Sequence, residues 1–321
     1  MVTYTFMTIR QLISIVTPCY NEESNVTNHF ERVKSAISSF RKKYDFEFIY
    51  TDNCSTDNTF QILKSLSSQH ERVRILRFSR NIGAARAMML GLEHSKGDAS
   101  ILIQADLQDP PELIPLFIQG WESGSDVVYG KIEQRFENVV MRILRRIYYK
   151  VVTKLSDVPI PENVGDFRLT SRRVLNSLSH YHEYDLYLRG AIAHIGYPQM
   201  AVPYVREARA GGRSSAGLPY LFSFALNGMI STTVVPIRAV ILIGLITSGT
   251  GLLFTIGYIA SRFIFPSAAP HGFTTLVSLV TFFAGCQMLA LGIIGEYIRK
   301  IYIESLGRPR GFIQDRIGFD A

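Results

Sequence analysis

The sequence predicts an α/β domain of Rossmann-like type, with a mostly parallel sheet and helices on both faces, followed by two transmembrane helices. Two observations predict this architecture. Between residues 12 and 129, short apolar runs alternate with helical stretches, which is the pattern of strands joined by crossover helices. Nearer the C-terminus, two uncharged apolar segments of about 22 residues follow, and each is long enough to cross a bilayer.

The elements of the α/β domain are expected in regular order along the chain. Strands are predicted at residues 12–18, 46–51, 73–78, 99–104 and 126–129. Helices are predicted between them, at residues 25–43, 58–68, 81–94 and 112–122. This alternation favours a sheet whose helices lie on both of its faces.

Polar clusters follow four of the predicted strands, beginning near Tyr20, Asp52, Asn81 and Asp106. Turns also favour Asn, Asp and Ser, so each cluster on its own could be a turn. In open α/β sheets, however, ligands bind at the edge where parallel strands end. Four clusters at one edge therefore favour a binding site.

The rest of the chain is divided by its charge and apolar content. Residues 1–215 are assigned to a cytoplasmic catalytic domain, in which 138–158 form a basic amphipathic helix. That helix either lies at a membrane interface or covers the core, and both interpretations stay open. Residues 216–234 are assigned to a juxtamembrane helix, 235–298 to the two transmembrane helices, and 299–321 to a cytoplasmic C-terminal tail.

The basic residues set the expected orientation and partners. Arginine and lysine flank the two apolar segments on their outer ends, so the positive-inside rule places both termini in the cytoplasm. A net charge of +7 suits a membrane surface or phosphorylated substrates, and no nucleic-acid-binding module is evident. Three unevenly spaced cysteines predict neither a disulfide framework nor a zinc site. Glycines in both apolar segments permit a homo-oligomer without requiring one.

Two motifs carry the predicted chemistry. Asp106-Leu107-Gln108-Asp109 follows a strand, and its hard oxygen donors suit Mg²⁺ or Mn²⁺, which would neutralise a diphosphate. Gly165-Asp166-Phe167-Arg168 is expected as a flexible turn that combines a carboxylate and a cation. Asp57 is expected to cap the helix that follows it.

Five motifs occur in a fixed order, and together they resemble a known enzyme family. They are 17–23 (Thr-Pro-Cys-Tyr-Asn-Glu-Glu), 52–59, 79–83 (Ser-Arg-Asn-Ile-Gly), 106–112 and 164–169 (Val-Gly-Asp-Phe-Arg-Leu). The series resembles the GT-A-fold, family 2 inverting glycosyltransferases. More narrowly, it is similar to bacterial polyprenyl-phosphate glycosyltransferases, relatives of dolichol-phosphate mannose synthase. The resemblance covers nearly the whole chain.

The resemblance implies a role for each group of residues. The nucleotide sugar would be bound by Pro18, Tyr20, Asn21, Glu22, Asp52, Arg80, Asn81 and Gly83. Asp106 and Gln108 would hold the metal, and the catalytic residues would be Asp106, Asp166 and Arg168. The diphosphate or the lipid phosphate would meet Arg206, Arg209 and Arg213.

The sequence departs from the family pattern at four places. Gln104 stands where the first acid of an Asp-x-Asp metal motif is usual, which puts a third metal contact in doubt. Asn53-Cys54 replaces Asp-Gly, Ala84 replaces a common lysine, and Ser215-Ala216 replaces lysine with an aromatic residue.

The expected function is transfer of a hexose from a nucleotide sugar to polyprenyl (undecaprenyl) phosphate, with inversion, at the cytoplasmic face of the bacterial inner membrane. The chain would be a multi-pass protein there. UDP-glucose is the favoured donor, while GDP-mannose, UDP-N-acetylhexosamine and UDP-aminoarabinose remain alternatives. Two other readings stay open: a glycosyltransferase with a non-lipid acceptor, and an inactive membrane-anchored adaptor that retains the nucleotide pocket.

Overall fold

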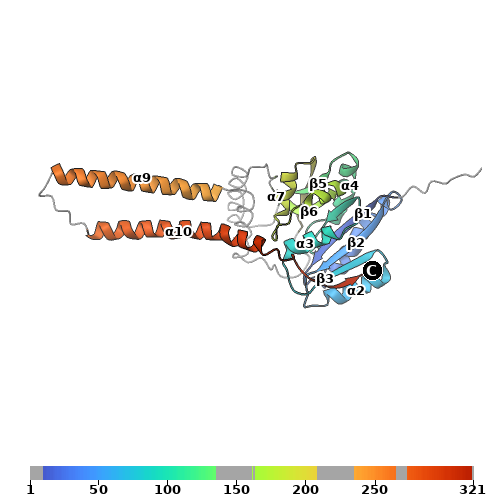
Figure 1. Cartoon of the computed structure of the whole chain (residues 1–321). Coiled ribbons are helices and arrows are strands. Elements are labelled where there is room, and N and C mark those ends of the chain that lie inside the picture. The colour runs from blue at the N-terminus through green and yellow to red at the C-terminus, as the bar shows by residue number, and fades with distance from the viewer. Residues whose placement is uncertain (1–9, 135–160, 162, 208–234, 265–272, 320–321) are drawn as a thin grey trace, which may run out of the picture. The chain divides into compact units, whose positions relative to one another are not determined.

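The computed structural model describes residues 10–134, 161, 163–207, 235–264 and 273–319 (Figure 1). These residues belong to two compact units. One comprises Met1–Ser231 together with Arg308–Ala321, and the other comprises Thr232–Gly307. Several predictions concern residues outside the described ranges: the helices at 138–158 and 216–234, and the side chains of Arg209, Arg213 and Ala216.

The first unit is built on one eight-stranded sheet in the order β7-β5-β6-β4-β1-β2-β3-β8. Its strands are β1 (Leu12–Cys19), β2 (Asp45–Asp52), β3 (Val73–Phe78), β4 (Ala99–Leu102), β5 (Val127–Gln134), β6 (Val164–Ser171), β7 (Gln199–Val205) and β8 (Ile313–Ile317). Strands β4, β1, β2 and β3 run parallel, β6 pairs antiparallel with both β4 and β5, and β8 pairs antiparallel with β3. The predicted mostly parallel α/β sheet is therefore confirmed.

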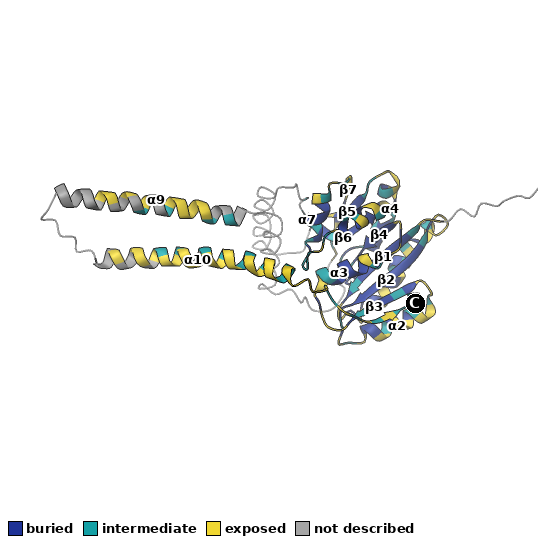
Figure 2. Cartoon of the chain, in the orientation of Figure 1, coloured by how far each residue is buried: buried dark blue, intermediate teal, exposed yellow. Residues whose placement is uncertain are grey.

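Helices cover both faces of the sheet because the buried side chains of each strand alternate between two apolar cores. Ile13 and Ile15 of β1 face one core, which also contains residues of α1 (Val26–Ala36), α2 (Thr59–Gln69) and α4 (Ile114–Glu122). Val16 faces the other core, with α3 (Ala84–Glu93), α6 (Arg172–Leu178) and α7 (Leu188–Ile195). Figure 2 shows the sheet strands as largely buried.

Each helix is placed by an apolar stripe at helical spacing. In α1 the buried side chains Val26, Phe30 and Val33 recur every three or four residues and pack on the sheet. The predicted helix at 25–43 ends earlier than expected, at Ala36, and a short 3-10 turn (Ser38–Phe40) follows. The helix predicted from 81 begins at Ala84, because Gly83 has a φ of 88° and lies outside the helix.

Two segments have a different structure from the one expected. Residues 165–168, predicted as a flexible turn, lie inside strand β6. The segment at 299–321 was predicted to be a tail, yet α10 continues to Ser305, and β8 joins the sheet beside β3. In Figure 1 β8 is the red strand next to β3. The first unit is therefore assembled from two separate parts of the chain.

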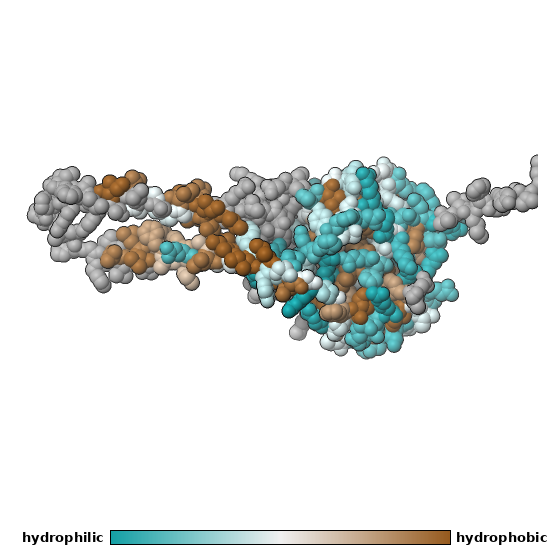
Figure 3. Space-filling model, viewed as in Figure 1, coloured by the Kyte–Doolittle hydropathy of each residue, from teal (hydrophilic) through white to brown (hydrophobic). Residues whose placement is uncertain are grey.

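The second unit consists of two long helices, α9 (Val235–Ile264) and α10 (Phe273–Ser305), which contain the two apolar segments found in the sequence. Many large apolar side chains on them are exposed, among them Leu245 at 67% and Met288 at 69%. Figure 3 shows this apolar surface in brown. Within the described residues, no helix has the combination of length and apolar character that crossing a membrane requires. The two crossings therefore stay a prediction.

Candidate active site

The structure brings all four predicted polar clusters to one edge of the sheet, since β3 also runs parallel to β2 and pairs Arg77 with Asp52. Because β1, β2 and β4 are parallel neighbours, Cys19 pairs with Asp52 and Val16 pairs with Leu102. The chain segments that follow these strands consequently leave from the same edge. The loop after β1 thus lies between Asp52 on one side and the segment that leads to Asp106 on the other.

Asp52 is a fully buried carboxylate at the end of β2. Its Oδ1 accepts a hydrogen bond from the backbone N–H of Ser55 at 3.2 Å. Its Oδ2 lies 3.4 Å from Nε of Arg77, whose guanidinium stacks on Phe60. Burial raises the pKa of Asp52 above its ordinary value. Oδ2 accepts no hydrogen bond from any described residue, so it can accept one from a ligand.

The loop after β1 is held against the loop after β2 by side-chain hydrogen bonds. Asn21 has a φ of 55°, its N–H donates to Oγ of Ser55 at 3.0 Å, and its Oδ1 accepts from the N–H of Thr56 at 2.9 Å. The N–H of Glu22 donates to Oγ1 of Thr59 at 2.8 Å. Asn21 and Glu22 therefore shape the loop. Tyr20 is 39% exposed and is available to a ligand.

Contrary to the prediction, Asp57 is not the N-cap residue of α2: the N-cap is Asn58, whose side chain makes no capping hydrogen bond, and Asp57 bonds the first turn from one residue earlier. Oδ1 of Asp57 accepts from the N–H of Thr59 at 3.0 Å. Oδ2 of Asp57 accepts from the N–H of Glu23 at 3.2 Å. Asp57 therefore satisfies backbone donors of both loops and has a structural role.

Asn53 is a residue whose importance sequence reasoning missed. It is buried, its Oδ1 accepts from the N–H of Ile82 at 2.8 Å, and its Nδ2 donates to Oδ1 of Asn81 at 3.0 Å. Oδ1 of Asn81 also accepts from the N–H of Gly83 at 2.9 Å. Asn53 thus joins the loop after β2 to the loop after β3, where Arg80 is exposed. Its departure from the family pattern was the available signal.

Cys54 has a φ of 61°, a left-handed conformation that favours glycine. We expect Cys54→Gly to be more stable than Cys54→Ala by about 1 kcal/mol, because only glycine adopts this conformation without a Cβ penalty. Both variants lose the thiol contact to the carbonyl of Ser79, so the comparison isolates the backbone. Thermal unfolding of the two variants measures the difference in stability. Equal unfolding midpoints would contradict a backbone penalty at position 54.

The loop after β4 presents Asp106 at the edge. Asp106 is 6% exposed, and its Oδ1 accepts from the N–H of Gln108 at 3.2 Å. Leu107, between them, has a φ of 57° and a buried side chain. A non-glycine residue in this conformation is strained, and such strain is concentrated at functional sites.

Asp109 anchors the same loop to the segment after β7. It is 1% exposed, and its Oδ1 lies 2.5 Å from the hydroxyl of Tyr204, which donates to it, and 3.1 Å from Nε of Arg206. Burial raises the pKa of Asp109, while the Arg206 charge opposes that shift. The carbonyl of Gln108 also accepts from the N–H of Glu207 at 3.0 Å. Arg206, predicted to meet a phosphate, is thereby held against the loop that carries Asp106.

Strand β6 positions the predicted pair of Asp166 and Arg168. Nε of Arg189, on α7, donates to Oδ1 of Asp166 at 3.0 Å. Burial tends to raise the pKa of Asp166, but the charge and hydrogen bond of Arg189 outweigh it and lower the pKa below its ordinary value. Arg168 is buried, and its guanidinium donates to the carbonyl of Gly165 at 2.8 Å. Burial lowers the pKa of Arg168 to about 10.

The residues near Asp106 fit a metal that arrives with a phosphorylated ligand. No cluster of three or more His, Cys, Asp or Glu side chains suited to a metal occurs in the part of the chain that the structure describes. Mg²⁺ usually keeps several waters and binds through only one or two carboxylates together with substrate phosphates. The carboxylate of Asp106 and the amide of Gln108, which is partly exposed, are donors of that kind.

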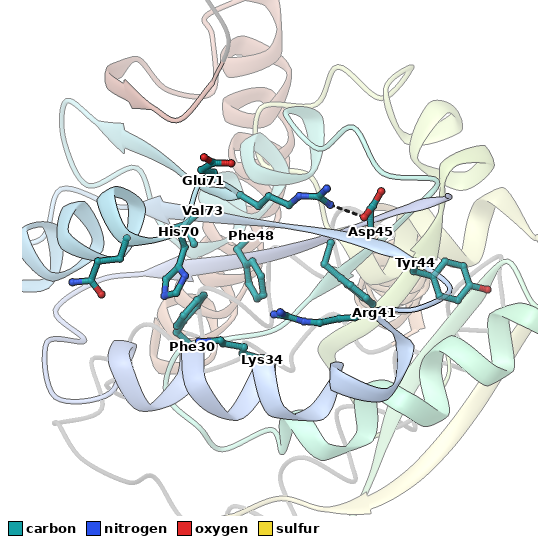
Figure 4. Close-up of a pocket in the computed structure, with 12 residues that line it drawn as sticks. Phe30, Lys34, Arg41, Tyr44, Asp45, Phe48, His70, Glu71 and Val73 are labelled. Atoms are coloured by element: carbon teal, nitrogen blue, oxygen red, sulfur yellow. Dashed lines mark ion pairs between the residues drawn. The ribbon is translucent and has the colours of Figure 1, made fainter. Parts of the chain in front are cut away.

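The structure also contains a pocket at the opposite edge of the sheet. It has a volume of about 430 Å³ and is lined by residues of α1 and by the first residues of β2 and β3. Figure 4 shows Arg41 and Lys34 directed toward its aromatic floor, with an ion pair between Arg72 and Asp45 at its side. Because it lies at the amino ends of the strands, it is separate from the site around Asp52 and Asp106.

Acidic residues and arginines lie together at the carboxyl edge of the parallel strands, and this arrangement suits a phosphorylated ligand. The class of protein follows from a match to a family model. Residues 14–179 match the model of glycosyl transferase family 2. The chain belongs to this family and is a transferase. The matched range contains most of β1 and all of β2 to β6, and with them Asp52, Asp106 and Asp166.

Two relatives match the chain over almost its full length. The bactoprenol glucosyl transferase of Shigella phage SfX is 34% identical over 305 residues, which cover 95% of this chain and 99% of that protein. The prophage bactoprenol glucosyl transferase homolog of Escherichia coli K12 is 34% identical over 303 residues, which cover 94% and 98%. A solved structure of glucosyl-3-phosphoglycerate synthase from Mycobacterium tuberculosis, with Mn²⁺, UDP-glucose and phosphoglyceric acid, is 20% identical, covers 69% and 79%, and gives a TM-score of 0.47.

Proposed function

We propose that this chain transfers glucose from UDP-glucose to polyprenyl phosphate with inversion at the sugar. The single observation that carries the proposal is the placement of Asp52 and Asp106 on either side of the loop after β1. This placement of two carboxylates on opposite sides of one loop suits an extended ligand, with a nucleoside at one end and a diphosphate at the other. The names of the full-length relatives support a bactoprenol acceptor and a glucosyl donor.

The nucleoside is proposed to bind beside Asp52. Oδ2 of this buried carboxylate lies near Arg77 but accepts no hydrogen bond from a described residue, so it is an acceptor for an N–H group, and uracil has one such group on its base edge. Pro18 is partly exposed and Tyr20 is exposed, so both can contact the ring and ribose from the neighbouring strand end. The Arg80 side chain is exposed on the next loop and can meet a phosphate.

The diphosphate is proposed to bind at Asp106 and Gln108. When bound there, a divalent metal would neutralise the charge that accumulates on the leaving nucleoside diphosphate. Asp106 would hold that metal as a carboxylate, and Gln108 would add a neutral oxygen. Arg206, held by Asp109 at 3.1 Å, would add a fixed positive charge next to these groups.

The reaction is proposed as a single in-line displacement. An oxygen of the lipid phosphate attacks the anomeric carbon and forms a new C–O bond, while the bond to the diphosphate breaks and its electron pair leaves with the nucleoside diphosphate. The attacking phosphate is anionic at neutral pH, so no strong general base is needed. Asp166 and Arg168, which are two residues apart and therefore on the same face of β6, would orient the sugar and the attacking phosphate.

The acceptor places this reaction at a membrane, and we propose the cytoplasmic face of the bacterial inner membrane. A polyprenyl chain is insoluble in water, so its phosphate is available only at a bilayer surface. The exposed apolar side chains of α9 and α10 suit contact with lipid.

Transfer of labelled glucose tests the function directly. With UDP-glucose and undecaprenyl phosphate in detergent micelles, we expect a labelled lipid product and free UDP. Excess EDTA should lower the rate by at least about a hundredfold, because the diphosphate charge is then no longer neutralised. Added Mg²⁺ or Mn²⁺ should restore it.

The same assay separates the alternatives. Parallel reactions with GDP-mannose, UDP-N-acetylglucosamine and UDP-aminoarabinose test the donor, and a soluble oligosaccharide replaces the lipid to test the acceptor. Transfer to the soluble sugar alone would refute the lipid acceptor. Absence of product and of UDP release with every donor would refute the enzyme and favour an inactive adaptor.

A further inference from the structure

The C-terminal segment Arg308–Ile317 touches the loop on which Arg80 and Asn81 lie. After α10 the chain re-enters the catalytic unit, and β8 pairs antiparallel with β3. Just before β8, the carbonyl of Phe312 accepts a hydrogen bond from the N–H of Ser79 at 3.0 Å. The residues immediately after β3 are therefore held in place by the C-terminal segment Arg308–Ile317.

Gly311 brings this segment into close contact with the same loop. A Cβ atom at position 311 would lie 2.8 Å from Cδ1 of Ile82 and 3.3 Å from Cδ1 of Leu90. The backbone of the segment thus packs directly on Ile82. The N–H of Ile82 in turn donates to Oδ1 of Asn53, the residue that follows Asp52. A continuous series of contacts therefore leads from Gly311 to the carboxylate proposed to bind the nucleoside.

Arg310 anchors the segment with its guanidinium. Nε donates to the carbonyl of Glu183 at 3.0 Å, and one terminal nitrogen donates to the carbonyl of Tyr181 at 2.5 Å. The other terminal nitrogen forms an ion pair with Glu93 at the end of α3. The Arg310 side chain is only 14% exposed, so these bonds are largely shielded from water.

The loop that Arg310 binds leads into the other half of the site. Residues 181–183 precede α7, the helix that carries Arg189, and Arg189 holds Asp166. Arg86 of α3 reinforces the same connection, because its Nε lies 2.7 Å from Oδ1 of Asp185. One arginine near the C-terminus thus joins α3, the loop before α7 and the segment that contacts Ile82.

We propose that Arg310 is a positioning residue for the nucleotide-sugar site, acting through the 79–83 loop, and that the C-terminal segment sets the affinity for the donor. This inference rests on the proposed function, because it assumes that the loop at Arg80 and Asn81 binds the donor. The chain's own C-terminus, which follows the helices that we place at the membrane, is then a structural part of the donor site.

Binding of UDP-glucose and of UDP, measured by calorimetry on the full-length protein, tests the inference. We expect Arg310→Ala to weaken both by about tenfold and to raise the KM for UDP-glucose similarly, with kcat at saturating donor changed much less. Arg310→Lys should recover part of the affinity, since it retains the charge near Glu93 but not the three-way hydrogen bonding. Arg308→Ala is the matched control: Arg308 is exposed and lies two residues away, so affinity should be unchanged.

A double-mutant cycle provides a second measurement. Because Arg310 and Glu93 act through one ion pair, Glu93→Gln should weaken donor binding in the same direction, and the two changes together should cost less than their sum. Thermal unfolding identifies variants that fail to fold. Folded Arg310→Ala protein with wild-type donor affinity would overturn the inference. If the wild-type protein itself binds neither UDP-glucose nor UDP, the proposed function fails instead.

Discussion

Asp106→Asn is expected to lower the turnover number by about a thousandfold, because it removes the negative charge that would hold the metal at the leaving diphosphate. The side chain keeps its size and can still accept the 3.2 Å hydrogen bond from the N–H of Gln108, so the loop is expected to remain folded. Radiolabelled transfer to undecaprenyl phosphate measures the rate. The metal concentration that gives half-maximal activity should rise in the same variant.

The matched control for this variant is Glu71→Gln. Glu71 is an exposed acid at the amino end of β3, beside the pocket of Figure 4, and its neutralisation changes the net charge by the same amount. Its turnover should stay within about twofold of wild type, since exposed charges beyond the Debye length of about 10 Å are largely screened. Asp106→Asn protein that turns over normally, while folded, would refute the metal assignment and with it the proposed position of the diphosphate.

The parallel half of the fold could be predicted closely because its signals are local. The strand at Val73–Phe78 was predicted with its observed bounds. The strand predicted at 12–18 ends one residue before the observed strand β1, which includes Cys19. Each of these strands is an apolar run bounded by polar turns, and each pairs on one side with β2, the strand next to it in the sequence. The carboxyl edge then follows from parallel order alone, which is why the sequence could place Asp52 and Asp106 at the same edge.

The antiparallel half could not be predicted in the same way, because its pairings are distant in sequence. Strand β8 has only five residues, three of them polar, and its partner β3 lies more than two hundred positions earlier. Strand β6 carries Gly165 and Asp166, residue types that are rare in strands and that favoured a turn. Its partners β4 and β5 override that local preference, since every residue of β6 but Asp166 is buried.

The buried ion pairs were missed for a related reason. Asp109 was part of a predicted motif, but its partners Tyr204 and Arg206 lie about a hundred residues further along, and no local pattern connects them. Arg189 lies in the eight-residue helix α7, whose sequence carries no chemical motif. An ion pair between residues that are far apart in the chain leaves no periodic signal in a single sequence. Only the fold therefore reveals that Arg189 supports Asp166.

Asp166→Asn is expected to destabilise the protein by about 3 kcal/mol, because it removes the negative partner from a largely buried ion pair with Arg189. Asp166 is 18% exposed and Arg189 17%, so solvent screens the remaining guanidinium poorly. The pKa of Asp166 is lowered in the folded state, so its contribution to stability is full above the unfolded pKa and is lost as pH falls through the folded value. Thermal unfolding at neutral and acid pH measures this: the variant and the wild type should converge in acid.

Two comparisons separate the charge from the packing at Asp166. Asp185→Asn breaks the ion pair with Arg86, in which Asp185 is 41% exposed, and should cost at most about 1 kcal/mol because that pair is screened by water. Asp166→Asn combined with Arg189→Gln removes both charges and should cost less than the sum of the single changes. Turnover of folded Asp166→Asn should still fall by about a hundredfold, since the carboxylate proposed to orient the sugar, which Arg189 holds in place, would then lose its charge. Unchanged stability in this variant would mean that the Asp166–Arg189 contact contributes nothing to the fold, and unchanged turnover would remove Asp166 from the reaction.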